Sequence, residues 1–278
     1  MRLRGRPIPK VPTRISGLDE VLEGGLPRGR TTLASGGPGS GKTVLGLEFL
    51  CRGALAGEPG VFVTFEERAE AVRTNALSMG WDLAALEKAG KIALIEARLP
   101  GEEVLAGDFD VQGVLAIIEG HAKRIRAKRV VMDALDVLLR VYNDPKRERN
   151  ELYRLHDWLI DRKLTSVLTV KAQLDGSMAH RYEFLDFMAD CVISLDHRVV
   201  GQVATRRLRV IKYRGSGFGT NEYPYVIGDH GIVLFPLTQA ELTHQPLGPK
   251  ISSGLGGLDA MLEPRRVGIR VHRDLADA

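Results

Sequence analysis

Short apolar runs alternate along the chain with segments in which apolar residues recur at helical spacing. Such runs are typical of strands buried on both faces, whereas the helical spacing predicts amphipathic helices between them. We expect strands at 30–35, 60–65, 91–95, 129–133, 165–170 and 191–195, and helices at 43–50, 67–79, 111–128 and 146–163. Strands that alternate with helices predict an α/β fold, with a mostly parallel central sheet and helices on both faces.

The pattern changes towards the C-terminal part of the chain. From 203 to 235, short apolar runs are separated by turn residues and show no helical spacing. This predicts antiparallel strands that extend one edge of the sheet. Residues 1–12 are basic and Pro-rich without periodicity. We expect them to form a flexible arm, with a nucleic-acid tether as the alternative.

One short motif occurs twice. Residues 13–23 run from a small-residue turn into Leu-Asp-x-x-Leu-Glu, and residues 251–263 do the same. Self-similarity of this kind indicates a tandem architecture. We therefore expect a domain at 13–240, a linker at 241–250, and the truncated start of a second repeat at 251–278.

Composition narrows the function only slightly. The 278 residues are 44% hydrophobic and 27% charged, as in ordinary globular proteins, and the net charge of +4 requires neither a nucleic-acid nor a membrane partner. No stretch of the sequence has the length and apolarity of a membrane span or a signal peptide, so we expect a cytoplasmic protein. Cys51 and Cys191 lie in apolar stretches and are expected to be buried thiols.

The strongest chemical signal is the segment 36–43, which reads Gly-Gly-Pro-Gly-Ser-Gly-Lys-Thr and fits the P-loop pattern. Its glycines allow backbone N–H groups to close around a polyphosphate, because a Cβ atom would block that approach. Lys42 is expected to reach the β- and γ-phosphates of ATP, and the Thr43 hydroxyl to complete a Mg²⁺ shell. A predicted strand before the loop and a predicted helix after it favour an anion site over a surface turn. The expected nucleotide contacts are Gly37, Pro38, Gly39, Ser40, Gly41, Lys42 and Thr43.

Further segments occur in a fixed order around this loop. They are 15–30, Phe-Glu-Glu within 60–67, Gly-Trp-Asp at 80–82, 129–133, Lys-x-Arg-Gly within 212–216, 222–224 and 229–231. In this combination the chain resembles the KaiC-type ATPases of the RecA superfamily, most of all the first of the two KaiC repeats. The resemblance implies a RecA-like fold and a ring, hexameric in the family, with ATP between its subunits. It also implies slow ATP hydrolysis as a timing or signalling activity of the circadian-clock type, with clock or signalling proteins as partners.

The resemblance assigns roles to residues outside the P-loop as well. Glu66 and Glu67 are expected to orient and partly deprotonate the attacking water, with helix initiation as the structural alternative. Lys212 and Arg214 are expected to contact the γ-phosphate of a neighbouring subunit, or else to form a solvated strand face. Asp133, at the end of an apolar strand, fits a Walker B carboxylate near Mg²⁺, or a helix N-cap. Further implied nucleotide contacts are Ser78, Tyr213, Ser216, Phe218, Gly228 and Asp229.

The sequence departs from the family pattern in three segments. Phe218 stands where relatives commonly carry His, so a polar contact is expected to become stacking. Asp186 and Phe187 replace a Ser-Thr pair, and neither has a hydroxyl that could accept phosphate. The strand end that often carries Thr-Glu in relatives is Val170-Lys171 here.

Three other functions remain as alternatives. The first is a serine/threonine autokinase in a full-length tandem protein. The second is a RecA-like DNA-binding ATPase, although residues 173–182 lack a sustained basic and aromatic run, so a nucleic-acid partner is not expected. The third is a scaffold that binds ATP without hydrolysing it, against which the presence of both Glu66 and Glu67 argues.

Overall fold

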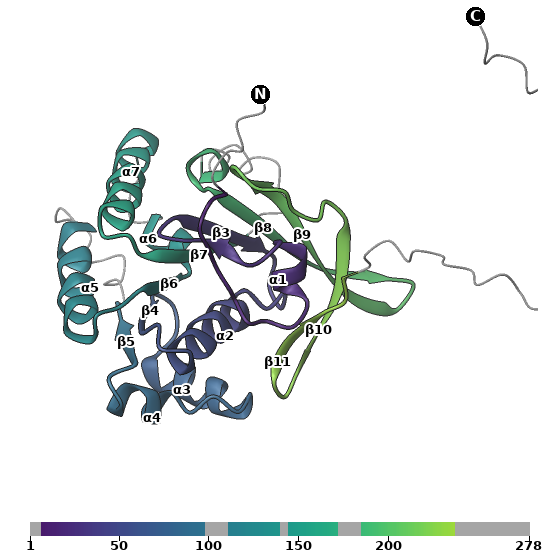
Figure 1. Cartoon of the computed structure of the whole chain (residues 1–278), viewed down its shortest axis with the longest axis horizontal. Helices are drawn as coiled ribbons and strands as arrows, with labels where there is room; N and C mark the ends of the chain where they lie inside the picture. The colour runs from purple at the N-terminus through teal and green to yellow at the C-terminus, as the bar shows by residue number, and fades with distance from the viewer. Residues whose placement is uncertain (1–6, 98–110, 140–143, 172–184, 237–278) are drawn as a thin grey trace, which may run out of the picture. The chain divides into compact units, whose positions relative to one another are not determined.

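The computed structural model describes residues 7–97, 111–139, 144–171 and 185–236 (Figure 1). The predicted linker at 241–250, the predicted second repeat at 251–278 and the proposed DNA loops at 173–182 lie outside these residues. Within the described ranges, no helix is both long and apolar enough to cross a membrane.

The described part of the chain is built on a nine-stranded sheet in the order β11-β10-β9-β8-β3-β7-β6-β4-β5. The strands β8, β3, β7, β6, β4 and β5 run parallel to one another. Their bounds are Cys191–Val200, Thr31–Gly36, Thr165–Lys171, Arg129–Asp133, Gly60–Thr64 and Ile92–Glu96. The antiparallel strands β9 (Val203–Tyr213), β10 (Glu222–Gly228) and β11 (Gly231–Leu234) continue the sheet beyond β8. This arrangement confirms the predicted α/β class with its antiparallel extension.

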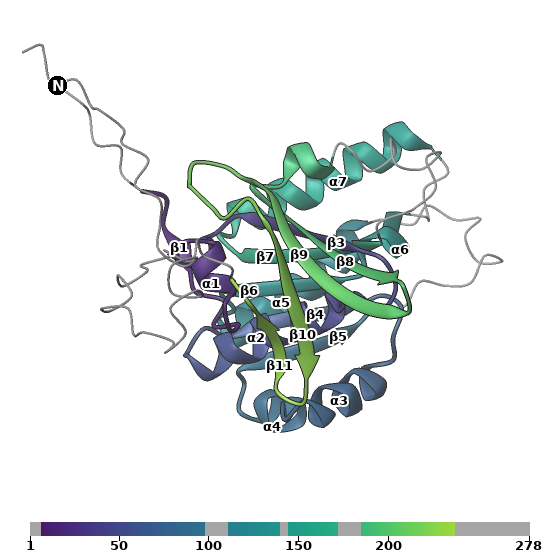
Figure 2. The ribbon, with the colours of Figure 1, turned by 90° about the vertical axis from the view of Figure 1, so that its right-hand side faces the viewer.

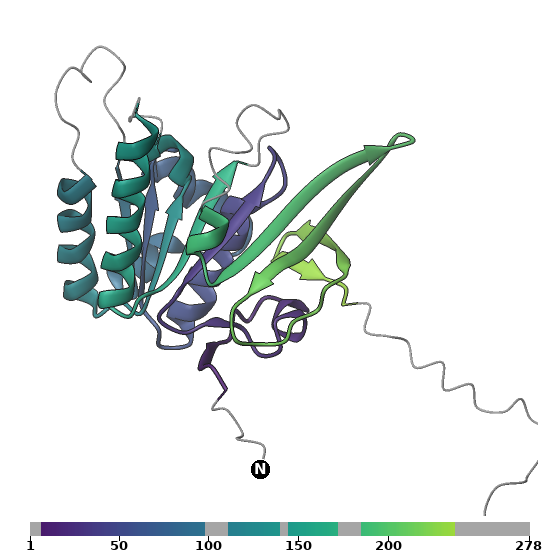
Figure 3. The ribbon, with the colours of Figure 1, turned by 90° about the horizontal axis from the view of Figure 1, so that it is seen from above.

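Helices cover both faces of the parallel strands (Figure 3). On one face, α2 (Lys42–Leu55) packs Phe49 and Leu50 into a core that includes Phe62 of β4. On the other face, α5 (Val111–Ile125) and α7 (Pro145–Asp161) pack against the alternate strand residues, among them Val61 and Val130. Because side chains of a strand alternate between its faces, strands buried on both sides need the continuous apolar runs seen in the sequence.

The remaining helices are shorter. In the described ranges they include α1 (Leu18–Val21), α3 (Ala69–Ser78), α4 (Leu83–Lys88) and α6 (Leu135–Leu139). The β10–β11 hairpin runs along α2 towards α3 and α4 (Figure 2). Glu48, which is fully buried in α2, accepts a hydrogen bond from the backbone N–H of Ile232 at 2.7 Å and ties the hairpin to this helix.

Besides the short helices α1, α4 and α6, which were not predicted, the structure differs from the predicted strands in two places. Part of the predicted flexible arm forms a strand, since β1 (Lys10–Val11) pairs antiparallel with β2 (Leu26–Pro27). In addition, β8 continues past residue 195 to Val200, and β9 is eleven residues long rather than short. The two strands form an extended hairpin, in which backbone pairing continues beyond the core to exposed residues such as Val199 and Val203.

Candidate nucleotide-binding site

The P-loop connects β3 to α2, as the sequence predicts. Gly39 and Gly41 have φ values of 71° and 86°, a left-handed conformation that glycine adopts without steric strain. The buried Ser40 donates its hydroxyl hydrogen bond to the Gly37 carbonyl at 2.8 Å. Its own carbonyl accepts a hydrogen bond from the hydroxyl of Tyr225 in β10. The loop is therefore shaped both by its own backbone and by the antiparallel part of the sheet.

The ammonium group of Lys42 is hydrogen-bonded to the backbone of this loop. Its Nζ donates to the carbonyls of Gly36 and Gly37 at 2.7 and 3.0 Å. Burial lowers the pKa of Lys42, while the nearby carboxylates of Asp133 and Asp136 act in the opposite direction. A cation held in this position provides positive charge where a triphosphate would meet the backbone N–H groups of the loop.

Thr43, in the first turn of α2, lies next to Asp133, the last residue of β6. The Thr43 hydroxyl donates to Oδ2 of Asp133 at 2.8 Å, and the hydroxyl of Thr169 in β7 donates to Oδ1 of the same carboxylate. Burial raises the pKa of Asp133, and these two hydrogen bonds counteract that rise. Both carboxylate oxygens of Asp133 thus have side-chain partners at the end of β6.

These oxygen atoms fit a Mg²⁺ site. Mg²⁺ prefers hard oxygen ligands and is usually held by one or two protein groups together with substrate phosphates and water. Thr43 and Asp133 provide one hydroxyl and one carboxylate beside the P-loop. Among the described residues there is no cluster of three or more His, Cys, Asp or Glu side chains that could hold a metal without such help.

Glu66 and Glu67 follow β4 at the same carboxyl edge of the sheet. Oε1 of Glu66 pairs with Nζ of Lys171, the last residue of β7, at 2.6 Å. Oε2 of Glu67 accepts a hydrogen bond from Asn75 in α3 at 3.2 Å. Burial and the neighbouring charge of Asp133 raise the pKa of Glu67, and the Asn75 hydrogen bond lowers it. The two carboxylates are therefore adjacent in sequence but held by different elements.

Lys212 and Arg214 lie at the opposite end of the sheet. In the strand register, Gly36 pairs with Leu195, whereas the end of β9 near Tyr213 pairs with Cys191 at the start of β8. Nζ of Lys212 donates to the carbonyls of residues 186 and 187 at 2.6 and 3.2 Å, and Arg214 donates to the second of these carbonyls. Burial and the charge of Arg214 lower the pKa of Lys212. Within one chain, the structure does not bring this pair to the P-loop.

The other predicted nucleotide contacts lie in two groups, one on the P-loop side and one at the end of the sheet that carries Lys212 and Arg214. Gly228 and Asp229 form the turn of the β10–β11 hairpin, next to Ile227, whose side chain lies against Gly41 of the P-loop. Ser78, at the end of α3, is exposed and donates to the Asn75 carbonyl at 2.8 Å.

Three predicted contacts belong to the end that carries Lys212 and Arg214. The buried Tyr213 donates its hydroxyl hydrogen bond to the Gly25 carbonyl at 2.9 Å, and its ring stacks on Phe218 with centroids 6.5 Å apart. The Ser216 hydroxyl donates to the Gly217 carbonyl at 2.9 Å. Phe218 therefore stacks, but it stacks on a ring of its own chain.

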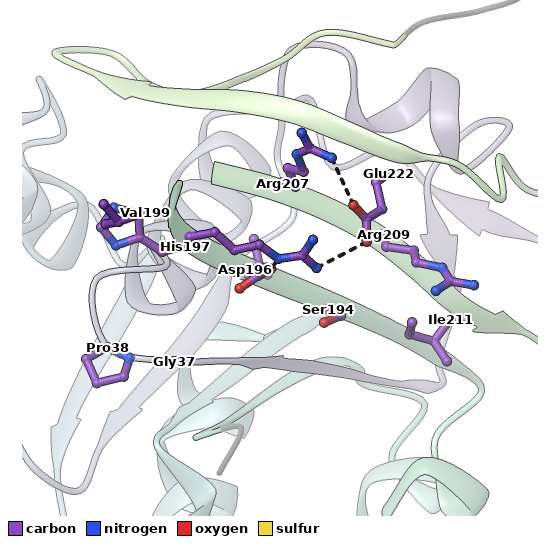
Figure 4. Close-up of a pocket in the computed structure, with 12 residues that line it drawn as sticks. Gly37, Pro38, Ser194, Asp196, His197, Val199, Arg207, Arg209, Ile211 and Glu222 are labelled. Carbon is purple, nitrogen blue, oxygen red and sulfur yellow. Dashed lines mark hydrogen bonds and ion pairs between the residues drawn. The ribbon is translucent and has the colours of Figure 1, made fainter. Parts of the chain in front are cut away.

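A pocket of about 720 Å³ lies between the P-loop and the β8–β9–β10 strands (Figure 4). Its charged lining includes Glu222, which lies 3.3 Å from Arg198 and 3.2 Å from Arg207. Arg209 also lines the pocket. Arg206, the sequence neighbour of Arg207 in β9, donates to the Gly39 carbonyl at 3.1 Å. Sequence reasoning did not find these residues, although the alternation of Arg with buried apolar residues in β9 was visible.

Known proteins share the sequence and the fold. A model of the KaiC ATPase family matches residues 11–239. The chain is 39% identical over 254 residues to the circadian clock protein KaiC2 of Synechocystis sp., and 38% identical over 257 residues to the circadian clock oscillator protein KaiC of Synechococcus elongatus. These alignments cover 91% of this chain but 44% and 49% of the two relatives, so the chain spans about half the length of the curated relatives it matches. A solved structure of a KaiC-like protein from Pyrococcus horikoshii is similar with a TM-score of 0.73 and 36% identity, covering 83% of this chain and 100% of that one.

Proposed function

The chain belongs to the KaiC family of ATPases, and from that premise we propose that it hydrolyses ATP at the interfaces of a ring formed by copies of itself. Six subunits are the expected number, by resemblance to the family. The turnover is proposed to be slow, and the ring to act as a timing or signalling module that binds clock or signalling proteins. No nucleic-acid or membrane partner forms part of the proposal.

The observation that supports the ring is the separation of two groups that ATP hydrolysis needs together. The P-loop lies at the carboxyl end of β3, whereas Lys212 and Arg214 lie beside its amino end. From Thr32 to Gly36 the strand spans four residue steps, or about 13 Å. A triphosphate in the P-loop can therefore meet such a cation pair only if a second chain supplies it. Arginine fingers supplied in trans are a known way to stabilise charge on a transferring phosphoryl group.

The P-loop side would hold the substrate. Lys42 and the loop N–H groups bind the phosphates, and the Glu66–Glu67 pair orients the water that attacks the γ-phosphoryl group. When bound at Thr43 and Asp133, Mg²⁺ supplies positive charge to the β- and γ-phosphoryl oxygens. The Tyr225–Ser40 hydrogen bond and the Ile227 contact hold the loop in the shape needed for binding.

The decisive experiment measures mass in solution with and without ATP and Mg²⁺, followed by phosphate release from the same fractions. We expect ATP-dependent rings that hydrolyse ATP, and a loss of turnover without a loss of assembly in Arg214→Ala. Arg124→Ala, which changes an exposed arginine on α5, is the matched control and should hydrolyse normally. A chain that stays monomeric with ATP, or an Arg214→Ala variant with undiminished turnover, would refute the proposal.

A further inference from the structure

Lys171 occupies a position beside the P-loop that the proposed function does not use. It is the last residue of β7 and the register partner of Gly36, with which the P-loop begins. Its backbone N–H donates to Oδ1 of Asp136 at 3.2 Å, and its Nζ donates to Oε1 of Glu66 at 2.6 Å. Lys171 is thus fixed at its backbone and also engaged at the end of its side chain.

The charges around this pair come from four elements. Lys42 faces the pair from α2 and Glu67 from the segment after β4. Asp133 lies at the end of β6, and Asp136 lies in the first turn of α6. Nζ of Lys42 donates to the carbonyl of Gly36 at 2.7 Å, and Gly36 is the register partner of Lys171, so the ammonium group of Lys42 lies beside the backbone position that pairs with Lys171. Burial lowers the pKa of Lys42, and the charge of Lys171 adds to that effect. The Lys171–Glu66 pair therefore lies where a bound γ-phosphate would face the P-loop lysine.

Glu66 needs a partner to keep one position. Its side chain is 41% exposed, and the carboxylates of Glu67 and Asp133 lie near enough to influence one another. Glu67 has its own hydrogen bond from Asn75, whereas Lys171 is the side chain that holds Glu66 among the described residues. The Lys171 side chain is 36% exposed, so the pair contributes little to the stability of the fold. Its effect is on where the carboxylate lies.

We propose that Lys171 is a positioning residue for ATP hydrolysis, which holds the Glu66 carboxylate so that it orients the attacking water. In that step the water oxygen forms a bond to the γ-phosphorus, and the bond from the γ-phosphorus to the bridging oxygen breaks. ADP leaves with the bridging oxygen, and the proton of the water passes through Glu66 to the solvent. Lys171 exchanges no proton. This inference rests on the proposed function, because it concerns a step of the same reaction.

The first test replaces Lys171 by Gln. Misplacement of a reacting group by about 1 Å reduces rates by up to about 100-fold, so kcat should fall by roughly 10-fold or more. The Kd for ATP, measured by titration with a fluorescent nucleotide, should change by a much smaller factor than kcat, because Glu66 acts on the water and its pairing with Lys171 offsets the lysine charge near the phosphates. Lys171→Arg should restore most of the rate. Lys123→Gln breaks a Lys–Glu pair of 2.7 Å on α5 and should leave both quantities unchanged.

The second test asks whether Lys171 acts through Glu66. If it does, the double variant Glu66→Gln/Lys171→Gln should be no slower than Glu66→Gln alone. Where Glu66 is intact, its carboxyl ¹³C resonance in the nucleotide-free protein should also differ from that of the wild type in Lys171→Gln, and should match the wild type in Lys123→Gln.

The outcomes separate this inference from the proposed function. A wild-type chain that binds ATP but releases no phosphate would overturn both. If the wild type hydrolyses ATP, two results would overturn the inference alone. Lys171→Gln could be as fast as the wild type, or the losses of rate from Lys171→Gln and Glu66→Gln could multiply in the double variant. An unshifted Glu66 resonance in Lys171→Gln would do the same, because it would mean that the two side chains do not interact in solution.

Discussion

The placement of the P-loop and Arg214 at opposite ends of one sheet predicts that two inactive variants restore each other's activity. A Glu66→Gln/Glu67→Gln chain retains its P-loop and its arginine but cannot orient water. An Arg214→Ala chain retains its P-loop and both carboxylates but offers no guanidinium to its neighbour. In a mixed ring, an interface between the P-loop of the second chain and the arginine of the first carries every group.

The size of the recovery follows from the geometry. A complete site needs its P-loop side from one variant and its arginine from the other, since about 13 Å of strand separates the two ends within a chain. With equal, random mixing each requirement is met half of the time, so about a quarter of the interfaces are complete. Loss of an arginine finger reduces kcat by about 10³- to 10⁵-fold, so each variant alone should be near background. The mixture should reach about a quarter of the wild-type rate.

The assay measures phosphate release per chain after the two variants are mixed and allowed to exchange subunits with ATP and Mg²⁺. The mass of the same fractions shows whether mixed rings have formed. A mixture of Glu66→Gln/Glu67→Gln with Asp133→Asn is the control, because both variants damage the P-loop side and no interface is repaired. If mixed rings form and the first mixture stays at background, Arg214 does not act on a neighbouring site.

Four further predictions follow from individual contacts. Burial raises the folded-state pKa of Asp133 above its unfolded value, so ionisation of this carboxyl group lowers the stability of the fold as pH rises. At pH 7, Asp133→Asn should therefore leave the melting temperature of the nucleotide-free protein equal or higher. The same variant should abolish the increase in melting temperature that ATP and Mg²⁺ cause. Gly41→Ala should weaken ATP binding in a nucleotide titration more than Gly57→Ala. Both glycines have positive φ, but a Cβ atom at Gly41 would lie 2.5 Å from a β10 side chain, whereas a Cβ atom at Gly57 would have no neighbour within 4 Å. Arg129→Ala should reduce the free energy of unfolding in urea by about 1–3 kcal/mol, because it leaves the Phe49 and Pro12 carbonyls, which accept hydrogen bonds from this 1% exposed guanidinium, without that donor. Burial and a neighbouring carboxylate raise the pKa of Glu67, so the acid limb of the kcat–pH profile should lie above pH 4.5. A limb at or below that pH would contradict a role for Glu67 as a base.

The hydrophobic pattern predicted the parallel strands closely because those strands are buried on both faces. The strand 129–133 has the predicted bounds, and its five residues are all buried. The pattern missed α1, α4 and α6, which are four, six and five residues long and too short to show a helical period. It also missed the outer half of β8, where the polar residues Asp196, His197 and Arg198 interrupt the apolar run but continue the backbone pairing with β9.

The site was predictable where its residues are contiguous in sequence. The P-loop can be read from eight neighbouring residues, and its hydrogen bonds from Lys42 and Ser40 remain within the loop. Contacts between distant segments could not be predicted in this way. Lys171 and Glu66 are 105 positions apart, and Tyr225 and Ser40 are 185 positions apart. Only the folded sheet brings these pairs to one edge, so the departure at Lys171 was visible in the sequence but its partner was not.

The way in which Lys212 and Arg214 are held explains how a changed sequence at 186–187 is compatible with their proposed role. They donate to the backbone carbonyls of these two residues, and a carbonyl accepts a hydrogen bond whatever side chain the residue carries. Asp and Phe can therefore replace a hydroxyl-bearing pair without disturbing the contact. A lysine ammonium has three donors and a guanidinium has five, so these bonds leave donors available for an anion. Since the side chains are anchored before a phosphate arrives, they need little reorganisation when negative charge develops on it.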